Sequence, residues 1–242
     1  ARGVDHVDFV GHPLAGEVKA RFDREEFCRR NGLDPARPII SFLPGSRHKE
    51  LQRILPPMLD AIERLHHQYP EVQPVVVLAP SRTEAETRAI LSQYNSDHLK
   101  LVQQQTREAL AAADAAAIAS GTATLEAALL ETPMVIVYKE SEVNWHTLGR
   151  LITVPHYGLV NLVAGKEIAT ELMQNMLTSE NLITKLLELL DPETFPPAPS
   201  HSCSRISKAR PSSCTSWGRQ HMRTCWRSTG ASSGMPSVGM AG

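Results

Sequence analysis

Two glycine-containing turns have the backbone and side-chain groups that are best suited to bind a phosphate. The first is Pro44-Gly45-Ser46-Arg47, which follows an apolar run, and the second is Ser120-Gly121-Thr122, which ends the run Ala115–Ala119. Apolar residues at helical spacing begin after each turn. Because a helix N-terminus presents unpaired N–H groups and the positive end of the helix dipole, both turns favour a bound anion.

Two charged side chains lie close to these turns. Arg47 presents an always-charged fork directly after the first turn, which suits a phosphate, and a salt bridge to Glu50 is the alternative. Glu126 lies one turn into the second helix, one residue beyond the position that a capping box starting from Thr122 requires. We expect Glu126 either to accept hydrogen bonds from the two hydroxyls of a ribose or to be an ordinary surface glutamate.

Apolar runs and helical patterns alternate along the middle of the chain, which predicts an α/β fold. The runs are continuous, which is typical of a parallel sheet with helices on both faces. Strands are expected at 38–43, 74–79, 99–102, 115–119 and 134–138, and helices at 17–32, 51–65, 83–94, 106–112, 122–129, 167–174 and 181–190. Ligands of such sheets lie at the carboxyl ends of the strands, where Gly45 and Gly121 fall.

Two stretches after the last predicted strand leave alternatives open. Asn161 stands alone in the apolar run Tyr157–Gly165, so its amide either ties backbone segments together or contacts a ligand. Trp145, Leu148 and Leu151 form a short apolar pattern that either packs in the core or contacts a membrane.

Charge and cysteine content exclude several classes of function. From Pro196 onward the chain has six basic and no acidic residues, so residues 1–195 hold 19 basic against 26 acidic residues, a formal charge of −7. A general nucleic-acid surface is therefore not expected, and a phosphate site must be built locally. Cys28 is the only cysteine before this tail, which fits a reducing compartment. No paired acidic cluster calls for a metal ion, and no apolar run is long enough to span a membrane.

The composition divides the chain into three parts. Residues 1–15 have the character of a last strand and linker from a preceding domain, and residues 16–192 form the α/β domain. Residues 193–242 are rich in Ser and lack periodicity, so they are expected to form a low-order tail. A shifted reading frame is one hypothesis for this tail, and sequencing of the source DNA tests it.

Four motifs in register resemble lipid-A-disaccharide synthase, a glycosyltransferase of the family 19 type. They are FVGHPL at Phe9–Leu14, FLPGSRHKEL at Phe42–Leu51, ASGTATLEAALLETPMVIVYK at Ala119–Lys139 and GLVNLVAGKEIATELMQN at Gly158–Asn175. The resemblance covers residues 5–190 in the order and spacing of the family, so it is far more specific than any one motif.

The resemblance implies the C-terminal, donor-binding Rossmann-like domain of a two-domain, inverting enzyme of the GT-B type. The family joins UDP-2,3-diacylglucosamine to 2,3-diacylglucosamine 1-phosphate and releases UDP, without a cofactor, at the cytoplasmic face of the inner membrane. The implied donor site contains Gly45, Ser46, Arg47, Ser120, Gly121, Thr122, Glu126, Asn161 and Gln174. An apolar lining for the acyl chains is expected at Trp145, Leu148 and Leu151.

The resemblance also implies that the general base and the acceptor pocket belong to an N-terminal domain that precedes this sequence. We therefore expect this chain alone to have little or no turnover. Two rival functions are another UDP-sugar enzyme of the same architecture, such as an epimerase or the peptidoglycan glucosaminyltransferase, and a nucleotide-binding module without catalysis. The motif Gly158–Glu167 argues against the first of these rivals.

Overall fold

Six parallel strands form one sheet in a computed structural model of the chain, which describes residues 14, 16–94, 97–141, 145 and 156–190. The strand order is β3-β2-β1-β4-β5-β6, and every neighbouring pair is parallel. The strands are β1 (Ile39–Leu43), β2 (Gln73–Leu78), β3 (Lys100–Gln103), β4 (Ala115–Ala119), β5 (Met134–Tyr138) and β6 (Thr170–Met173).

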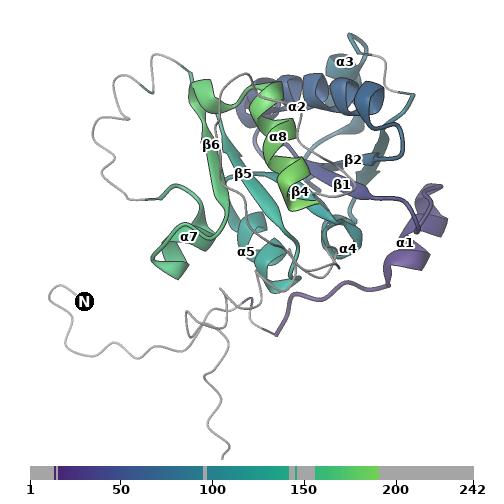
Figure 1. Cartoon of the computed structure of the whole chain (residues 1–242), viewed down its shortest axis with the longest axis horizontal. Helices are drawn as coiled ribbons and strands as arrows, with labels where there is room; N and C mark the ends of the chain where they lie inside the picture. Colours follow the sequence, from purple (N-terminus) through teal and green to yellow (C-terminus); the bar gives the residue numbers. More distant parts are fainter. Residues whose placement is uncertain (1–13, 15, 95–96, 142–144, 146–155, 191–242) are drawn as a thin grey trace, which may run out of the picture.

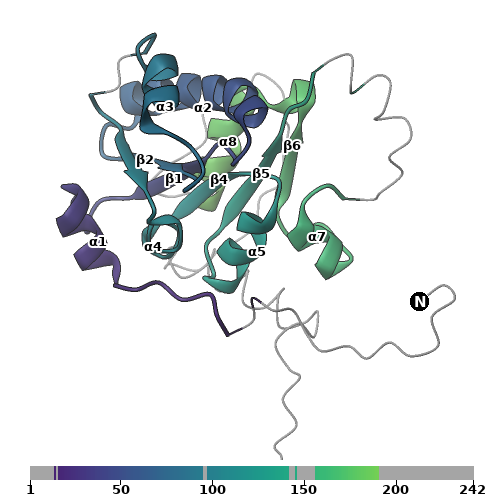
Figure 2. The same cartoon turned by 180° about the vertical axis from the view of Figure 1, so that it is seen from behind.

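Helices cover both faces of this sheet (Figure 1). One face is covered by α2 (His48–Gln68) and α8 (Ser179–Leu189), with α3 (Glu84–Leu91) beside α2. The opposite face, seen from behind in Figure 2, is covered by α1 (Arg24–Asn31), α4 (Thr106–Ala112), α5 (Thr122–Leu129) and α7 (Leu159–Ala164). The expected α/β fold, a Rossmann-like parallel sheet between two helical layers, is confirmed.

Two apolar cores explain why the strands read as continuous apolar runs. All five residues of β1 and all five of β4 are buried. Alternate side chains of these strands point to opposite layers: Phe42 packs with α2 and α8, whereas Ile39 and Ile118 pack with α1, α4 and α5. A strand that is buried on both faces must be apolar along its whole length.

Helix α2 continues through Pro56 and Pro57. It is one helix of 21 residues, and its apolar stripe, which includes Leu51, Ile54 and Met58, is fully buried. Burial of this stripe compensates for the hydrogen bonds that two interior prolines remove.

The predicted helix over residues 167–174 is wrong, because Thr170–Met173 forms the edge strand β6. Its residues pair with β5 in parallel register, from Val135 opposite Thr170 to Tyr138 opposite Met173. Glu, Leu, Met and Gln favour helices intrinsically, but pairing with an open sheet edge outweighs this weak preference. The first helix is also shorter than expected, since α1 begins at Arg24 and not near Glu17.

The central strands β1 and β4 lie side by side although β2 and β3 separate them in sequence. Their register pairs Leu43 with Ile118, so both strands end at the same edge of the sheet. The strand order reverses between them, and such a switch point is where ligands of open α/β sheets bind. The segments 1–13 and 191–242, with the predicted linker and tail, lie outside the described residues.

Candidate functional site

The first corner of the site is the turn between β1 and α2. Gly45 has a φ of +110°, a left-handed conformation that disfavours other residues. Arg47 is the N-cap of α2, so the helix begins one residue later, at His48. The turn therefore points the start of a 21-residue helix toward the carboxyl end of β1.

Glu50 closes back onto this first corner. Its Oε2 accepts hydrogen bonds from the backbone N–H groups of Ser46 and Arg47 at 3.1 and 3.2 Å, and its Oε1 accepts from the Arg47 guanidinium at 2.7 Å. The Arg47 side chain is 81% exposed, and that of Glu50 is 16% exposed. The salt bridge that we weighed against a phosphate role is thus present, and the carboxylate of Glu50 occupies the donors that an anion would use.

The second corner is the turn between β4 and α5. Helix α5 begins at Thr122, and its N-cap is Gly121, one residue earlier than the expected cap at Thr122. No side chain caps this helix. The N–H group of Thr124 bonds to the Gly121 carbonyl at 3.2 Å, whereas the N–H groups of Thr122 and Ala123, at the very start of the helix, have no partner within it. Ser120 is fixed by a hydrogen bond from its Oγ to the carbonyl of Tyr157, at 2.8 Å.

The two corners share one cavity of about 490 Å³. Apolar side chains of Leu43, Val77 and Ile118 lie at the ends of the strands beneath it. The predicted residues that line it are Gly45, Ser46, Arg47, Ser120, Gly121, Thr122 and Glu126. Seven of the nine predicted donor-site residues therefore meet in one hollow at the switch point.

Glu126 lines the cavity and is held by an arginine that sequence reasoning did not single out. Arg107, in α4, donates from Nε and Nη2 to the same Oε1 of Glu126, at 3.2 and 3.1 Å. The Glu126 side chain is 19% exposed. It is neither a free surface glutamate nor a cap of its own helix. Arg107 lies in the first turn of α4, close to the carboxyl end of β3, so it can reach this edge of the sheet, but no sequence pattern indicates that α4 lies beside α5.

Asn161 is buried, and its amide makes four hydrogen bonds within the protein. Its Nδ2 donates to the Ala169 carbonyl at 2.8 Å and to Glu171 Oε1 at 2.7 Å. Its Oδ1 accepts from the N–H groups of Ile168 and Ala169 at 2.9 and 3.0 Å. Asn161 therefore ties α7 to the start of β6, and it lies outside the lining of the cavity.

Gln174 follows β6 and also lies outside that lining. Its φ is +49°, an uncommon value for a residue other than glycine. Its Oε1 accepts a hydrogen bond from Glu140 N at 2.9 Å, while its buried Nε2 has no hydrogen-bond partner among the described residues. Gln174 is thus fixed beside the end of β5 through its Oε1, while its Nε2 can still donate a hydrogen bond.

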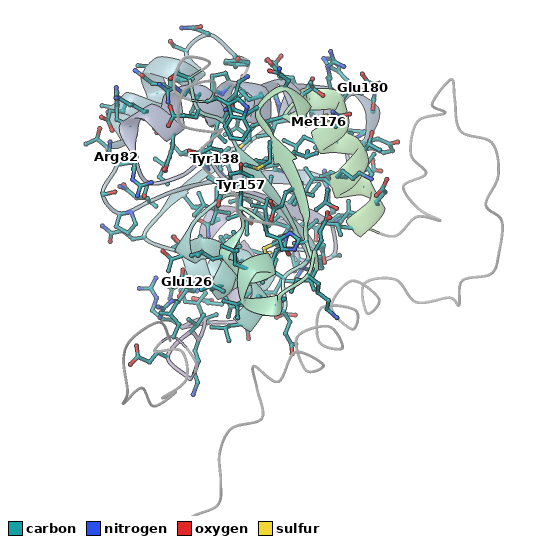
Figure 3. All side chains as sticks on the ribbon, turned by 90° about the vertical axis from the view of Figure 1, so that its left-hand side faces the viewer. Arg82, Glu126, Tyr138, Tyr157, Met176 and Glu180 are labelled. Atoms are coloured by element: carbon teal, nitrogen blue, oxygen red, sulfur yellow. The ribbon has the colours of Figure 1, made fainter. Side chains whose placement is uncertain are left out.

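An aromatic cluster lies next to the second corner. The rings of Tyr138 and Tyr157 stack with their centroids 6.5 Å apart, and Figure 3 shows these two side chains close together. Trp145 is partly buried, with its ring centroid 5.8 Å from that of Tyr157. Leu148 and Leu151, the other predicted apolar contacts, lie outside the described residues.

A second hollow, of about 510 Å³, lies beyond the end of β3. It is lined by Arg21, Phe22, Arg30 and Gln103–Gln105, none of which belongs to the predicted site. In the described part of the chain, no group of three or more His, Cys, Asp or Glu side chains is placed to hold a metal ion. None of the described helices meets the length and hydropathy that crossing a bilayer requires.

Chains of known function resemble this sequence over most of its length. The chain is 40% identical over 182 residues to the lipid-A-disaccharide synthase of Solibacter usitatus, which covers 75% of this chain and 47% of that protein. It is 39% identical over 184 residues to that of Nitrosococcus oceani, covering 76% and 47% of the two chains. It is 41% identical over 188 residues to that of Syntrophus aciditrophicus, covering 78% and 49%. The chain thus spans about half the length of these relatives.

Among solved structures, similarity is more distant. Heptosyltransferase II of E. coli, an ADP-heptose enzyme, has 17% identity and a TM-score of 0.48, covering 69% of this chain and 50% of that one. The glycosyltransferase WaaG has 16% identity and the same TM-score, covering 93% and 55%.

A protein-family model described as lipid-A-disaccharide synthetase matches residues 3–214. This match spans far more than half of the chain and includes both corners of the cavity. The chain belongs to the lipid-A-disaccharide synthase family.

Proposed function

We propose that this chain is the donor-binding half of a lipid-A-disaccharide synthase. In this proposal the diphosphate of UDP-2,3-diacylglucosamine binds in the cavity between the β1–α2 and β4–α5 corners. The observation that supports it most is the single hollow that Gly45 and Arg47 line from the first corner and Gly121 and Glu126 line from the second. Two helix N-termini and a guanidinium at one edge of a parallel sheet suit a diphosphate.

The proposed reaction transfers the 2,3-diacylglucosamine unit with inversion at its anomeric carbon. The 6-hydroxyl oxygen of 2,3-diacylglucosamine 1-phosphate forms a bond to that carbon while the bond from the carbon to the UDP oxygen breaks. A general base takes the hydroxyl proton, and the electron pair of the broken bond leaves on UDP. We propose that the base lies outside the described residues and that this half serves the leaving group.

Leaving-group stabilisation is the chemistry that the cavity can supply. Negative charge develops on the departing diphosphate, and fixed N–H dipoles with a guanidinium lower its energy without reorganising. For Arg47 to act in this way, its guanidinium must exchange the Glu50 carboxylate for the diphosphate. The Arg47 side chain is 81% exposed and an ion pair of an exposed arginine contributes little, so moving the guanidinium from Glu50 to the diphosphate costs little free energy.

The proposal also includes residues outside the lining of the cavity. Asn161 and Gln174 belong to the proposed donor site through the rigidity they give to the region beside the second corner. Trp145, with Leu148 and Leu151, is proposed to meet the acyl chains. The substrates are lipids, so we propose a peripheral contact with the cytoplasmic face of the inner membrane.

Titration calorimetry with UDP tests the donor site. We expect the chain to bind UDP, and Arg47→Ala to weaken binding by about 1.5–3 kcal/mol, the contribution of a hydrogen bond to a charged group. Arg29→Ala is the matched control, because Arg29 forms a similar i,i+3 ion pair with Glu26, is 73% exposed and lies outside the cavity. Absence of UDP binding, or equal losses in the two variants, contradicts the proposal.

A further inference from the structure

The carboxylate of Glu126 is held in an asymmetric way. Two N–H groups of Arg107 converge on its Oε1, and no described residue donates to its Oε2. The side chain is largely buried and lines the cavity. A carboxylate oxygen accepts two hydrogen bonds readily, so Oε1 is satisfied by the arginine while Oε2 keeps its capacity for a ligand.

Arg107 is itself fixed at a second point. Its Nη1 donates to the backbone carbonyl of Glu17 at 3.2 Å, so its planar fork bridges Glu126 and the segment before α1. Arg107 is the second residue of α4, and its neighbour Thr106 lines the cavity. The guanidinium is thus anchored by the backbone on one side, and on the other side two of its N–H groups donate to Oε1 of Glu126.

We propose that Arg107 is a positioning residue that orients Glu126 to recognise the two hydroxyls of the ribose in the bound nucleotide. This inference rests on the proposed function and deepens it. Arg107 would touch the carboxylate and not the nucleotide, and its effect would be on which sugar is accepted. A site built around a carboxylate that must receive hydroxyl donors discriminates strongly against a nucleotide that lacks them.

A second ion pair joins Arg21, which precedes α1, to Glu108, the residue after Arg107 in α4. Arg21 donates from Nε to Glu108 Oε1 at 2.7 Å and from its backbone N–H to the same oxygen at 3.0 Å. Burial alone would raise the pKa of Glu108, but the hydrogen bonds from Arg21 outweigh it, and the pKa lies below its usual value. Glu108 does not line the cavity between the corners, so Arg21 is a matched control for Arg107.

The experiment compares the affinities of the 242-residue chain for UDP and for 2′,3′-dideoxy-UDP. We expect the unmodified chain to prefer UDP by at least about 10-fold, since the lost hydrogen bonds involve a charged acceptor. Arg107→Met and Glu126→Gln should each reduce this preference to about 3-fold or less, and Arg107→Lys should retain part of it. Arg21→Met should leave the preference unchanged.

The possible outcomes distinguish the role of Arg107 from UDP binding itself. If Arg107→Met weakens both nucleotides equally and keeps the preference, Arg107 is only structural and the inference is overturned while UDP binding stands. If the unmodified chain binds UDP without preferring it over the dideoxy analogue, the role of Glu126 and that of Arg107 are both overturned. If UDP does not bind at all, the proposed function fails first. If Arg107→Met does not fold, Arg107→Lys and Glu126→Gln test the inference through the same ratio of affinities for UDP and 2′,3′-dideoxy-UDP.

Discussion

The two corners of the cavity have the same spacing of glycine and glutamate but use the glutamate differently. Gly45 precedes Glu50, and Gly121 precedes Glu126, by the same five positions. In the first corner the helix starts late, at His48, so Glu50 is its third residue and reaches back to the turn. In the second corner the helix starts at Thr122, so Glu126 is its fifth residue and is too far along to cap it.

Because of this difference, a side chain occupies the N–H donors of the first turn but not those of the second. The donors of the first turn are occupied by a carboxylate of their own helix, whereas the start of α5 has no side-chain cap. The glutamate of the second corner is instead held by Arg107 from a neighbouring helix. Where a helix begins therefore decides whether a glutamate competes with a bound anion or remains available to another part of the ligand.

The largest expected effect concerns the support of the second corner. Ser120 donates to the Tyr157 carbonyl, the N–H group of Tyr157 donates to Glu171, and Glu171 accepts from Asn161. We expect Asn161→Ala to lower the free energy of unfolding by about 3 kcal/mol, because it leaves the buried N–H group of Ala169 and the partly buried N–H group of Ile168 without partners.

Urea unfolding measures this loss. Asn181→Ala is the control, since the Asn181 side chain bonds to the Met176 carbonyl at a more exposed position and should cost less than about 1 kcal/mol. Equal losses would mean that the Asn161 network does not brace the second corner.

An intermediate effect should distinguish the two glycines. A Cβ added at Gly45 would lie 2.5 Å from Glu50 Oε2, and the φ of Gly45 is left-handed. A Cβ at Gly121 would have its nearest neighbour at 4.0 Å, and the backbone there is extended. We expect Gly45→Ala to cost about 1–3 kcal/mol of stability and Gly121→Ala less than about 0.5 kcal/mol.

Thermal or urea unfolding of the two variants gives this comparison directly. A Gly121→Ala variant that is as unstable as Gly45→Ala would show that the two turns are under similar strain, contrary to the geometry described above.

The smallest expected effect has opposite signs in the two corners. Glu50 occupies donors that a diphosphate would use, so Glu50→Gln should bind UDP about 2- to 5-fold more tightly, because it removes one negative charge that repels the diphosphate. Glu126→Gln should bind UDP more weakly. Calorimetry measures both affinities, and a Glu50→Gln variant that binds UDP more weakly would make Glu50 a shaping residue of the turn and not a competitor.

Much of the fold could be predicted because strands that are buried on both faces of the sheet appear as continuous apolar runs in the sequence. The ranges expected for β4, β5 and α4 agree with those observed, and β1 and β2 begin within a residue of their predicted starts. The edge strand β6 was missed, since its composition favours a helix and its pairing with β5 is a long-range contact.

The two turns of the candidate site could likewise be predicted, because glycines after strands mark the carboxyl ends of a parallel sheet. The partner of Glu126 could not. Arg107 lies in a helix whose place beside α5 depends on how the whole chain wraps around the sheet. The sequence also left open whether Arg47 pairs with Glu50, since this contact depends on where the helix begins.

The pairing of β1 with β4 has a consequence for the order in which the molecule assembles. These strands are separated in sequence by two strand–helix units, yet Ile40–Leu43 must align with Ala115–Ile118 before the corners can face each other. A contact of such long range forms at a high entropic cost of loop closure. A nucleotide that contacts both corners would bind only the molecule in which β1 and β4 are paired. Its binding would therefore raise the free energy required to separate these two strands.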